Sequence, residues 1–468
     1  MTYDRSQRAS GALRASPAGT GVQFEVSPHP AFVDEDVRVR VRGLPKASLI
    51  SIHAATEDDQ GRRWSSQALF RADSAGMIDA SVHESLDGSY RGVAPMGLFW
   101  SMESAAASAD GSSSFAKNTT SPDPVDFEAQ RDGQVLARAS LARNFLVRET
   151  VTRDLKIPNE TESANPGATA RTTAGETTVG RLFVPPGRGP HPVVIVLSGS
   201  GGGFDLDKAA VLSRHGFATL ALAYFGTVPF PTWLHRIPLE YFEAALGWLC
   251  AQPEIDSQRI GILGISRGAE LALLLGSTLP QIHAIVAYAP SSVAWAASGR
   301  DKATGELIPC WTWRGKPVPF APLPLRRFMW RSAFPVVALK RPVMFRNLFR
   351  AGLRNSAAVE RAAIPVENIR GPLLLISGGD DHLWPAAEMS EAIIARLKRH
   401  GGTHVPEHLH FPHAGHMLRY PHLPVTARHS RNKHLRGARF SFGGTPAADA
   451  EAQAQAWRRA ITFLRTHL

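Results

Sequence analysis

The sequence predicts a two-domain α/β protein, in which a small β-sandwich precedes a mostly parallel β-sheet covered by helices on both faces. Between about residues 21 and 100, apolar and polar residues alternate with period two in short runs bounded by turn residues, a pattern typical of a sandwich. Beyond residue 191, strand-like apolar runs alternate with helix-like runs, which indicates a parallel sheet between helical layers. At 468 residues, the chain is long enough for two domains of unequal size.

The first domain is predicted to span residues 21–147. Valine and arginine alternate over residues 37–42, another β-rich run begins at residue 49, and the strand-like residues 135–147 close the domain. The preceding residues 1–20 contain no apolar core of a signal peptide. We expect these twenty residues to form a disordered tail.

The second domain is predicted to span residues 148–468. Its central strands are expected at residues 193–197, 217–224, 260–263, 282–287 and 373–376, with a late or edge strand at 407–411. Helical spacing marks residues 239–249, and an amphipathic helix over residues 447–464 closes the chain. A basic insertion rich in proline, arginine and aromatic residues interrupts the alternation at about 291–367, where we expect a cap over the substrate.

The most specific motif is G-x-S-x-G at residues 264–268, between a buried-strand run and a helix-like run. This strand–turn–helix context is typical of a nucleophile elbow, in which the serine occupies a strained turn. The flanking glycines leave room for strand and helix to approach closely. Ser266 is therefore the candidate nucleophile, and the alternative is an ordinary glycine-rich turn.

A serine nucleophile needs a base to take its proton and an acid to orient that base. In α/β-hydrolases these residues follow in the order Ser, Asp, His. Asp380 and Asp381 both follow the predicted strand at residues 373–376. We favour Asp381 as the acid because it lies a few residues before Pro385, a helix start, and Asp380 is the alternative; the other aspartate would cap that helix.

The candidate base is His416, which follows the predicted strand at residues 407–411 on a flexible loop after a glycine. His413 lies on the same loop and is the alternative. His408 and His410 share one face of that strand, but no cysteine or set of carboxylates completes a metal site. We therefore predict no metal.

The segment SGSGGG at residues 198–203 follows the predicted strand at 193–197. It lacks the Lys-Ser/Thr ending of a P-loop and a full dinucleotide fingerprint. The interpretation we favour is an oxyanion loop, in which a backbone N–H near Ser200 or Gly201 acts together with that of Arg267. The alternative is a plain glycine turn.

Cations interleave with aromatic residues in the insertion, and no acidic residue interrupts them. The cations are Arg326, Arg327, Arg331, Lys340, Arg341, Arg346, Arg350 and Arg354. Such a stretch could bind the phosphates of CoA, with Arg326, Arg327 and Arg331 as the candidate contacts, while offering apolar surface to an acyl chain. A solvated helix face with buried aromatic side chains is the equal alternative.

Composition narrows the class of protein further. The net charge of +11 indicates a surface that attracts anions, but the basic residues are dispersed and no nucleic-acid-binding module appears. No window approaches the 18 apolar residues of a membrane span. Only two cysteines occur, without metal or redox spacing, so a cytoplasmic location is expected.

With these residues in place, the chain resembles the acyl-CoA thioesterase and bile acid-CoA:amino acid N-acyltransferase family from about residue 21 onward. The matching segments are residues 32–35, 41–44, 70–73 and 95–100 in the first domain, and 198–203, 221–224, 264–271, 380–384 and 415–416 in the second. The resemblance implies an immunoglobulin-like β-sandwich before an α/β-hydrolase domain. It also implies a nucleophile at Ser266, an acid at Asp381 and a base at His416.

The same resemblance implies the chemistry. Family members with a serine nucleophile resemble hydrolases, whereas those that transfer the acyl group to glycine or taurine use cysteine, so Ser266 favours water as the acceptor. The expected activity is cleavage of acyl-CoA to free fatty acid and CoA through an acyl-enzyme, without a cofactor. The alternatives are a carboxylesterase or acyl-CoA:amino acid N-acyltransferase on the same residues, and a catalytically silent binding protein.

Overall fold

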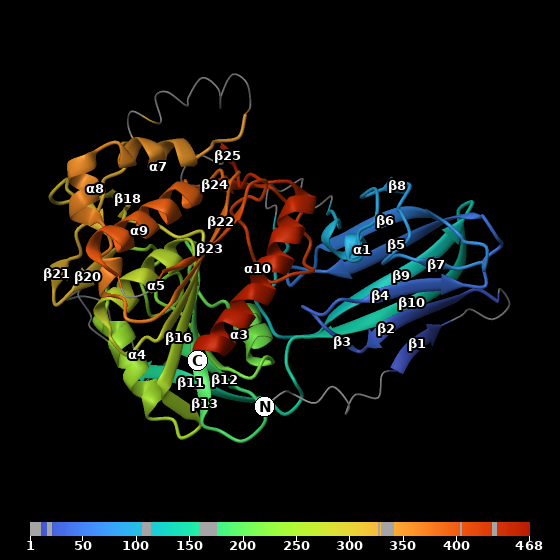
Figure 1. Cartoon of the computed structure of the whole chain (residues 1–468), viewed down its shortest axis with the longest axis horizontal. Helices are drawn as coiled ribbons and strands as arrows, with labels where there is room; N and C mark the ends of the chain where they lie inside the picture. The colour runs from blue at the N-terminus through green and yellow to red at the C-terminus, as the bar shows by residue number, and fades with distance from the viewer. Residues whose placement is uncertain are drawn as a thin grey trace, which may run out of the picture. The chain divides into compact units, whose positions relative to one another are not determined.

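The computed structural model describes residues 11–15, 21–104, 114–158, 176–325, 328, 341–402, 405–432 and 438–468. The chain divides into two compact units, neither of which is a single stretch of sequence (Figure 1). The first unit comprises Met1–Leu146, Arg341–Val343 and Arg419–Trp457, and the second comprises Val147–Lys340, Met344–Leu418 and Arg458–Leu468.

The first unit is built on two β-sheets. One has the strand order β1 (Gly11–Ala15), β2 (Gln23–His29), β4 (Arg38–Arg42) and β7 (Ile78–Asp79). The other has the order β3 (Ala31–Phe32), β10 (Gln134–Asn144), β9 (Asp123–Arg131), β5 (Leu49–Glu57), β6 (Arg63–Arg71) and β8 (Asp87–Gly88). A short helix, α1 (Gly97–Trp100), lies against β5 and β6.

The core of this unit lies between the two sheets. Phe24 of β2 and Phe127 of β9 are fully buried, with ring centroids 6.1 Å apart, and so join one sheet to the other. Burial alternates along β4, where valines are buried and arginines are not, as a half-buried strand requires. The predicted β-sandwich is therefore confirmed.

Two features of the first unit depart from the simple sequence pattern. Gly11–Ala15, expected in a disordered tail, forms strand β1, antiparallel to β2; the expectation was wrong there because backbone pairing needs no apolar side chain. Residues 1–10 and 16–20 lie outside the described residues.

The C-terminal stretch Arg419–Trp457 also belongs to this unit: Thr426 Oγ1 donates to the Met102 carbonyl at 2.6 Å. The hairpin of β24 (His429–Asn432) and β25 (Ala438–Ser441) belongs to this stretch.

The second unit contains an eight-stranded sheet that is mostly parallel. Its order is β11 (Val151–Pro158), β12 (Glu176–Val184), β14 (Ala218–Leu222), β13 (His191–Leu197), β16 (Ile255–Ile265), β17 (Ala284–Tyr288), β22 (Leu373–Gly378) and β23 (Glu407–Phe411). The strands from β14 to β23 run parallel, and β12 and β11 are added antiparallel at one edge. The central strands are buried on both faces, which explains their continuous apolar sequences.

Helices cover both faces of this sheet. In Figure 1, α4 (Glu240–Cys250), α5 (Arg267–Thr278) and α9 (Ala386–His400) lie on one side, and α3 (Leu206–Ser213) and the C-terminal end of α10 (Pro446–His467) lie on the other. Within the described residues, no helix is both long enough and apolar enough to cross a membrane. The doubly covered parallel sheet confirms the predicted fold class.

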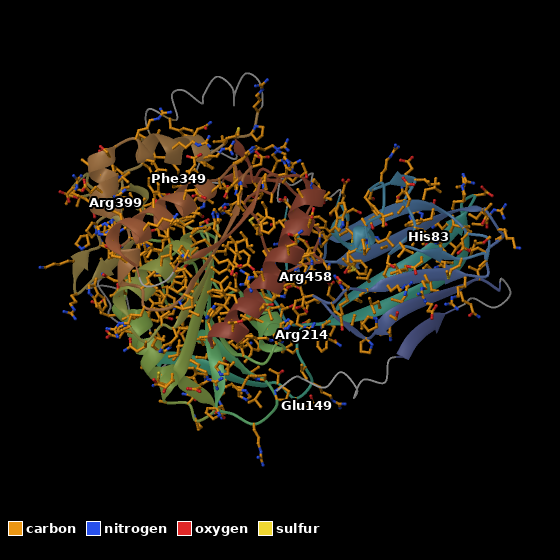
Figure 2. All side chains as sticks on the ribbon, in the orientation of Figure 1. His83, Glu149, Arg214, Phe349, Arg399 and Arg458 are labelled. Atoms are coloured by element: carbon orange, nitrogen blue, oxygen red, sulfur yellow. The ribbon has the colours of Figure 1, made fainter. Side chains whose placement is uncertain are left out.

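The insertion between β17 and β22 forms small elements of its own. They are β18 (Ala296–Arg300) paired with β19 (Leu307–Pro309), β20 (Trp311–Trp313) paired with β21 (Lys316–Pro317) and with β15 (Ile237–Pro238), α7 (Arg346–Leu353), α8 (Ser356–Ala362) and the 3-10 turn η2 (Val366–Asn368). Trp295 and Trp384 are buried in one apolar cluster, onto which Phe349 of α7 packs. Figure 2 labels Phe349 on this helix. The described part of the insertion is therefore attached to the main fold by aromatic packing.

A buried carboxylate organises the edge of the first unit. Asp79 of β7 is 1% exposed and accepts hydrogen bonds from Arg38 Nε at 2.7 Å, Arg40 Nε at 2.9 Å and Ser81 Oγ at 2.6 Å. Burial acts to raise the pKa of Asp79, but these donors outweigh it and hold the pKa well below its usual value. The ionised carboxylate therefore stabilises the folded unit.

Asp79→Asn should lower the free energy of unfolding at pH 7 by about 3 kcal/mol, the low end for a broken buried ion pair because solvent screens Arg38. A depressed folded pKa contributes stability above the unfolded pKa of about 4 and loses it as the pH falls further. The difference in melting temperature between wild type and variant should therefore shrink as the pH is lowered from 7 to 3. A difference that stays constant over this range would contradict the assignment.

Candidate active site

Ser266 occupies the turn between β16 and α5. Its φ of +57° and ψ of −118° are strained for a residue other than glycine. Its N–H donates to the Tyr288 carbonyl on β17 at 2.8 Å, and its carbonyl accepts from the amides of Ala269 and Glu270. The surrounding hydrogen bonds thus hold a strained serine where the strand becomes a helix, as the motif predicts.

The two glycines of the motif allow the backbones at this turn to touch. A Cβ on Gly264 would lie 2.2 Å from the Gly268 carbonyl oxygen, and a Cβ on Gly268 would lie 2.4 Å from the Ser198 carbonyl oxygen. A Cβ on Gly199 would lie 3.6 Å from the Ser266 Cβ. The glycine loop after β13 therefore lies directly beside the serine.

That loop begins with a tight turn. The Gly202 N–H donates to the Gly199 carbonyl at 3.1 Å, so Ser200 and Gly201 are the central residues of the turn. Arg267 is the first residue of α5, and the first N–H groups of a helix have no acceptor within the helix. The backbone amides expected to bind an oxyanion thus lie on two segments that meet at Ser266.

Asp381 and His416 form a buried hydrogen-bonded pair on the loops that follow β22 and β23. His416 Nδ1 lies 2.7 Å from Asp381 Oδ2, and the two residues are 3% and 1% exposed. Asp381 Oδ1 accepts from the amides of Leu383 at 2.8 Å and Trp384 at 3.1 Å. With both oxygens occupied, the carboxylate has a fixed orientation toward the imidazole.

The competing aspartate and histidine have other surroundings. Asp380 has a side chain that is 42% exposed and lies 2.9 Å from His382 Nε2, and its amide donates to the Ala414 carbonyl at 3.0 Å. His413 is exposed. The structure thus brings Asp381 together with His416, while Asp380 joins the backbones of the two loops.

One side chain near this pair, Trp384, had no role predicted from the sequence. The buried Trp384 packs edge-on against the His416 ring, with centroids 6.0 Å apart, and the Arg267 guanidinium lies 5.9 Å from the centroid of the same indole. The only local sign of this role was a tryptophan just after the Asp-Asp-His run. Its contact with Arg267 could not be predicted, because Arg267 lies on a helix 117 positions earlier in the chain.

Arg326, Arg327 and Arg331, predicted as candidate CoA contacts, lie outside the described residues. Of the described cations in the insertion, Arg346 Nη1 lies 3.4 Å from the Gly379 carbonyl oxygen, and Arg350 pairs with Glu388. Both arginines line a small pocket together with Asp381 and Trp384. Within the residues that the structure covers, no group of three or more His, Cys, Asp or Glu side chains could hold a metal ion.

A parallel sheet with a serine at a strand–turn–helix elbow, and a carboxylate–imidazole pair after two later strands, defines an α/β-hydrolase. Residues 34–156 match the family described as "Acyl-CoA thioester hydrolase/BAAT N-terminal region", and residues 237–468 match "BAAT / Acyl-CoA thioester hydrolase C terminal". The chain belongs to this family of acyl-CoA thioester hydrolases and BAAT-type acyltransferases.

Individual relatives cover nearly the whole chain. Acyl-coenzyme A thioesterase 1 of Rattus norvegicus is 31% identical over 451 residues, 93% of this chain and 94% of its own. Acyl-coenzyme A amino acid N-acyltransferase 1 of Mus musculus is 30% identical over 453 residues, 96% of this chain and 98% of its own. Among solved structures, the acylaminoacyl peptidase of Pyrococcus horikoshii has a TM-score of 0.40 at 13% identity, over 96% of this chain and 62% of that one.

The close approach at the elbow can be tested by adding one methyl group. Gly268→Ala should destabilise the second unit by about 3 kcal/mol and slow the reaction of Ser266 with a fluorophosphonate, because the new Cβ meets the Ser198 and Leu197 carbonyl oxygens. The matched control is Gly247→Ala on the exposed side of α4, where a Cβ meets nothing within 4 Å. The control should raise stability by about 0.5–1 kcal/mol, and equal effects of the two variants would contradict the packing argument.

Proposed function

We propose that the protein is a serine hydrolase that cleaves acyl-CoA thioesters to free fatty acid and CoA. The observation that carries this proposal is the serine at the elbow of a chain that is 31% identical, over 93% of its length, to an acyl-coenzyme A thioesterase. The buried hydrogen bond between His416 and Asp381 supports it, because an oriented imidazole is the base that a serine nucleophile requires.

In the first half-reaction, the Ser266 hydroxyl attacks the thioester carbon. His416 Nδ1 is held by Asp381, so Nε2 is the nitrogen that takes the serine proton. The backbone amides of Arg267 and Ser200 hold the oxyanion of the tetrahedral intermediate, each contributing about 10² to 10³ in rate. When the C–S bond breaks, the imidazolium returns the proton to the CoA sulfur and leaves an acyl-serine.

In the second half-reaction, water attacks the acyl-serine and His416 takes a proton from it. Collapse of the second tetrahedral intermediate breaks the bond between the acyl carbon and the Ser266 oxygen, and the proton returns to the serine. A thiol leaves more easily than an alcohol because its pKa of about 8.5 is lower, so the thioester demands less proton donation from His416 than an ester does.

Acyl transfer to an amino acid is the second candidate, favoured by the 30% identity to an amino acid N-acyltransferase. In that reaction an amine replaces water as the attacking group in the second half-reaction, and His416 still removes its proton. Whether the protein hydrolyses the acyl-serine or transfers its acyl group therefore depends on whether water or an amine reaches the acyl carbon. A carboxylesterase differs instead in the leaving group of the first half-reaction.

A cytoplasmic location forms part of this proposal. Cys250 and Cys310 are both free thiols, one exposed and one buried, which suits a reducing compartment. An acyl-CoA is also a polyanion, and the net charge of +11 favours its approach. Arg346 and Arg350 of α7 line a small pocket together with Asp381 and are candidates to bind the phosphates of acyl-CoA together with Arg326, Arg327 and Arg331.

The catalytic assignments predict a graded set of losses. Ser266→Ala and His416→Ala should each lower kcat for CoA release by at least about 10⁴, and Asp381→Asn by about 10⁴ through the wrong imidazole tautomer. Asp380→Asn should lower it less than about tenfold. Acyl-CoA turnover can be followed with a thiol reagent, and mass spectrometry should locate a fluorophosphonate on Ser266. A larger loss for Asp380→Asn than for Asp381→Asn would reverse the choice of acid.

The acceptor can be tested with a panel of acyl-CoAs in the presence and absence of glycine or taurine. Hydrolysis predicts release of one free fatty acid for each CoA at a rate that the amino acids leave unchanged. An N-acyl amino acid detected by mass spectrometry would instead favour acyl transfer. Turnover of simple esters without any CoA release would favour the carboxylesterase.

A further inference from the structure

Glu270 is a fully buried carboxylate in the first turn of α5, four residues after Ser266. Its Oε1 accepts from Trp311 Nε1 at 2.7 Å and from the Trp295 amide at 3.2 Å, and its Oε2 accepts from Arg267 Nη1 at 2.9 Å. Burial raises the pKa of Glu270, while Arg267 and the two N–H donors oppose that rise. The proposed mechanism uses no part of this carboxylate.

Arg267 connects the carboxylate to the residues around the proposed base. Its Nη2 donates to the Ala296 carbonyl at 3.2 Å, and its guanidinium lies over the Trp384 ring. Trp384 packs against the His416 ring, and its amide donates to Asp381. A continuous set of contacts therefore runs from Glu270 through Arg267 to the carboxylate–imidazole pair.

The same arginine carries one of the proposed oxyanion amides. Its side chain is held by Glu270 and Ala296, and its backbone directly follows the strained φ and ψ of Ser266. A strained residue keeps its conformation only where its surroundings over-determine it. Because both the side chain and the backbone of Arg267 are held in place, the direction of its backbone N–H is fixed as well.

Stability alone does not account for this ion pair. Replacement of a buried ion pair by well-packed apolar residues is often neutral or stabilising by about 1–4 kcal/mol. The positions around Glu270 in α5 are occupied by alanine and leucine, so an apolar helix face was available. A charged pair at this point therefore fits a need to orient the Arg267 side chain rather than a need to fill the core.

We propose that Glu270 is a positioning residue, which through Arg267 holds the Arg267 amide and the Trp384 indole in the arrangement that Ser266 and His416 need for acyl transfer. The inference rests on the proposed function because it assigns a role within the same site. Glu270 touches neither the substrate nor the reacting atoms.

Two variants separate positioning from stability. Glu270→Gln keeps the size of the side chain and an acceptor for Trp311, but removes the charge that holds Arg267. The double variant Arg267→Met/Glu270→Met removes both charges, and we expect it to fold with a Tm at or above that of wild type. Both should react with a fluorophosphonate at Ser266 about 10–100-fold more slowly than wild type, since a displacement of about 1 Å at a reacting centre costs about 100-fold.

The kinetic signature distinguishes a positioning role from a loss of fold. We expect kcat for CoA release to fall in parallel with the labelling rate, while KM changes less than about threefold, because the variants leave substrate contacts in place. The matched control is Glu367→Gln, which breaks the Glu367–Arg396 pair (2.6 Å) in the same unit. The control should lower Tm and leave the labelling rate unchanged.

A double variant that labels at the wild-type rate would overturn the positioning role, as would losses in Glu270→Gln that appear only in KM. Wild-type protein that labels at Ser266 without releasing CoA would refute the proposed substrate, while the labelling rates of the variants would still test Glu270. Wild-type protein that is not labelled at Ser266 would overturn both proposals.

Discussion

The close approach of α5 to the carboxyl end of β13 is the constraint on which the candidate site depends. It is possible only because residues 264 and 268 lack a Cβ, so that the carbonyl oxygens of Gly268 and Ser198 lie where side chains would otherwise stand. This contact brings the glycine loop, the strained Ser266 and the start of α5 into one small volume. The two amides that we propose to bind the oxyanion are brought to the serine by this backbone packing, and we propose that the contacts of the Arg267 side chain then fix the direction of its own N–H.

Three buried carboxylates are organised in the same way, and each is held by several donors. Asp381 binds His416 and two amides, Glu270 binds Arg267, an indole and an amide, and Asp79 binds two arginines and a serine. A buried carboxylate with too few hydrogen bonds would be an unpaired charge in a medium of low dielectric, at a large cost in free energy. These carboxylates therefore fix the orientation of the side chains and amides that bind them, and do more than add stability.

Much of the second unit could be predicted from local pattern. Residues 407–411 form β23 as expected, and the predicted helix at 239–249 is α4, displaced by one residue. The antiparallel pairing of β11 with β12 was not predicted, because both strands mix polar and apolar residues. The small sheet of β15, β20 and β21 was missed because strands of two or three residues carry no measurable period.

The sequence by itself determined the elbow and the chain order of the candidate serine, acid and base, because glycine spacing and strand-end loops are local features of the chain. It favoured Asp381 over Asp380 because of the nearby Pro385, and left Asp380 as the alternative. Only the tertiary structure decided which aspartate meets His416, and only it joined Glu270 to Trp311 and Arg267 to Trp384. The physical reason is that hydrogen-bond direction and burial depend on residues tens to more than a hundred positions apart, whose distances no local pattern specifies.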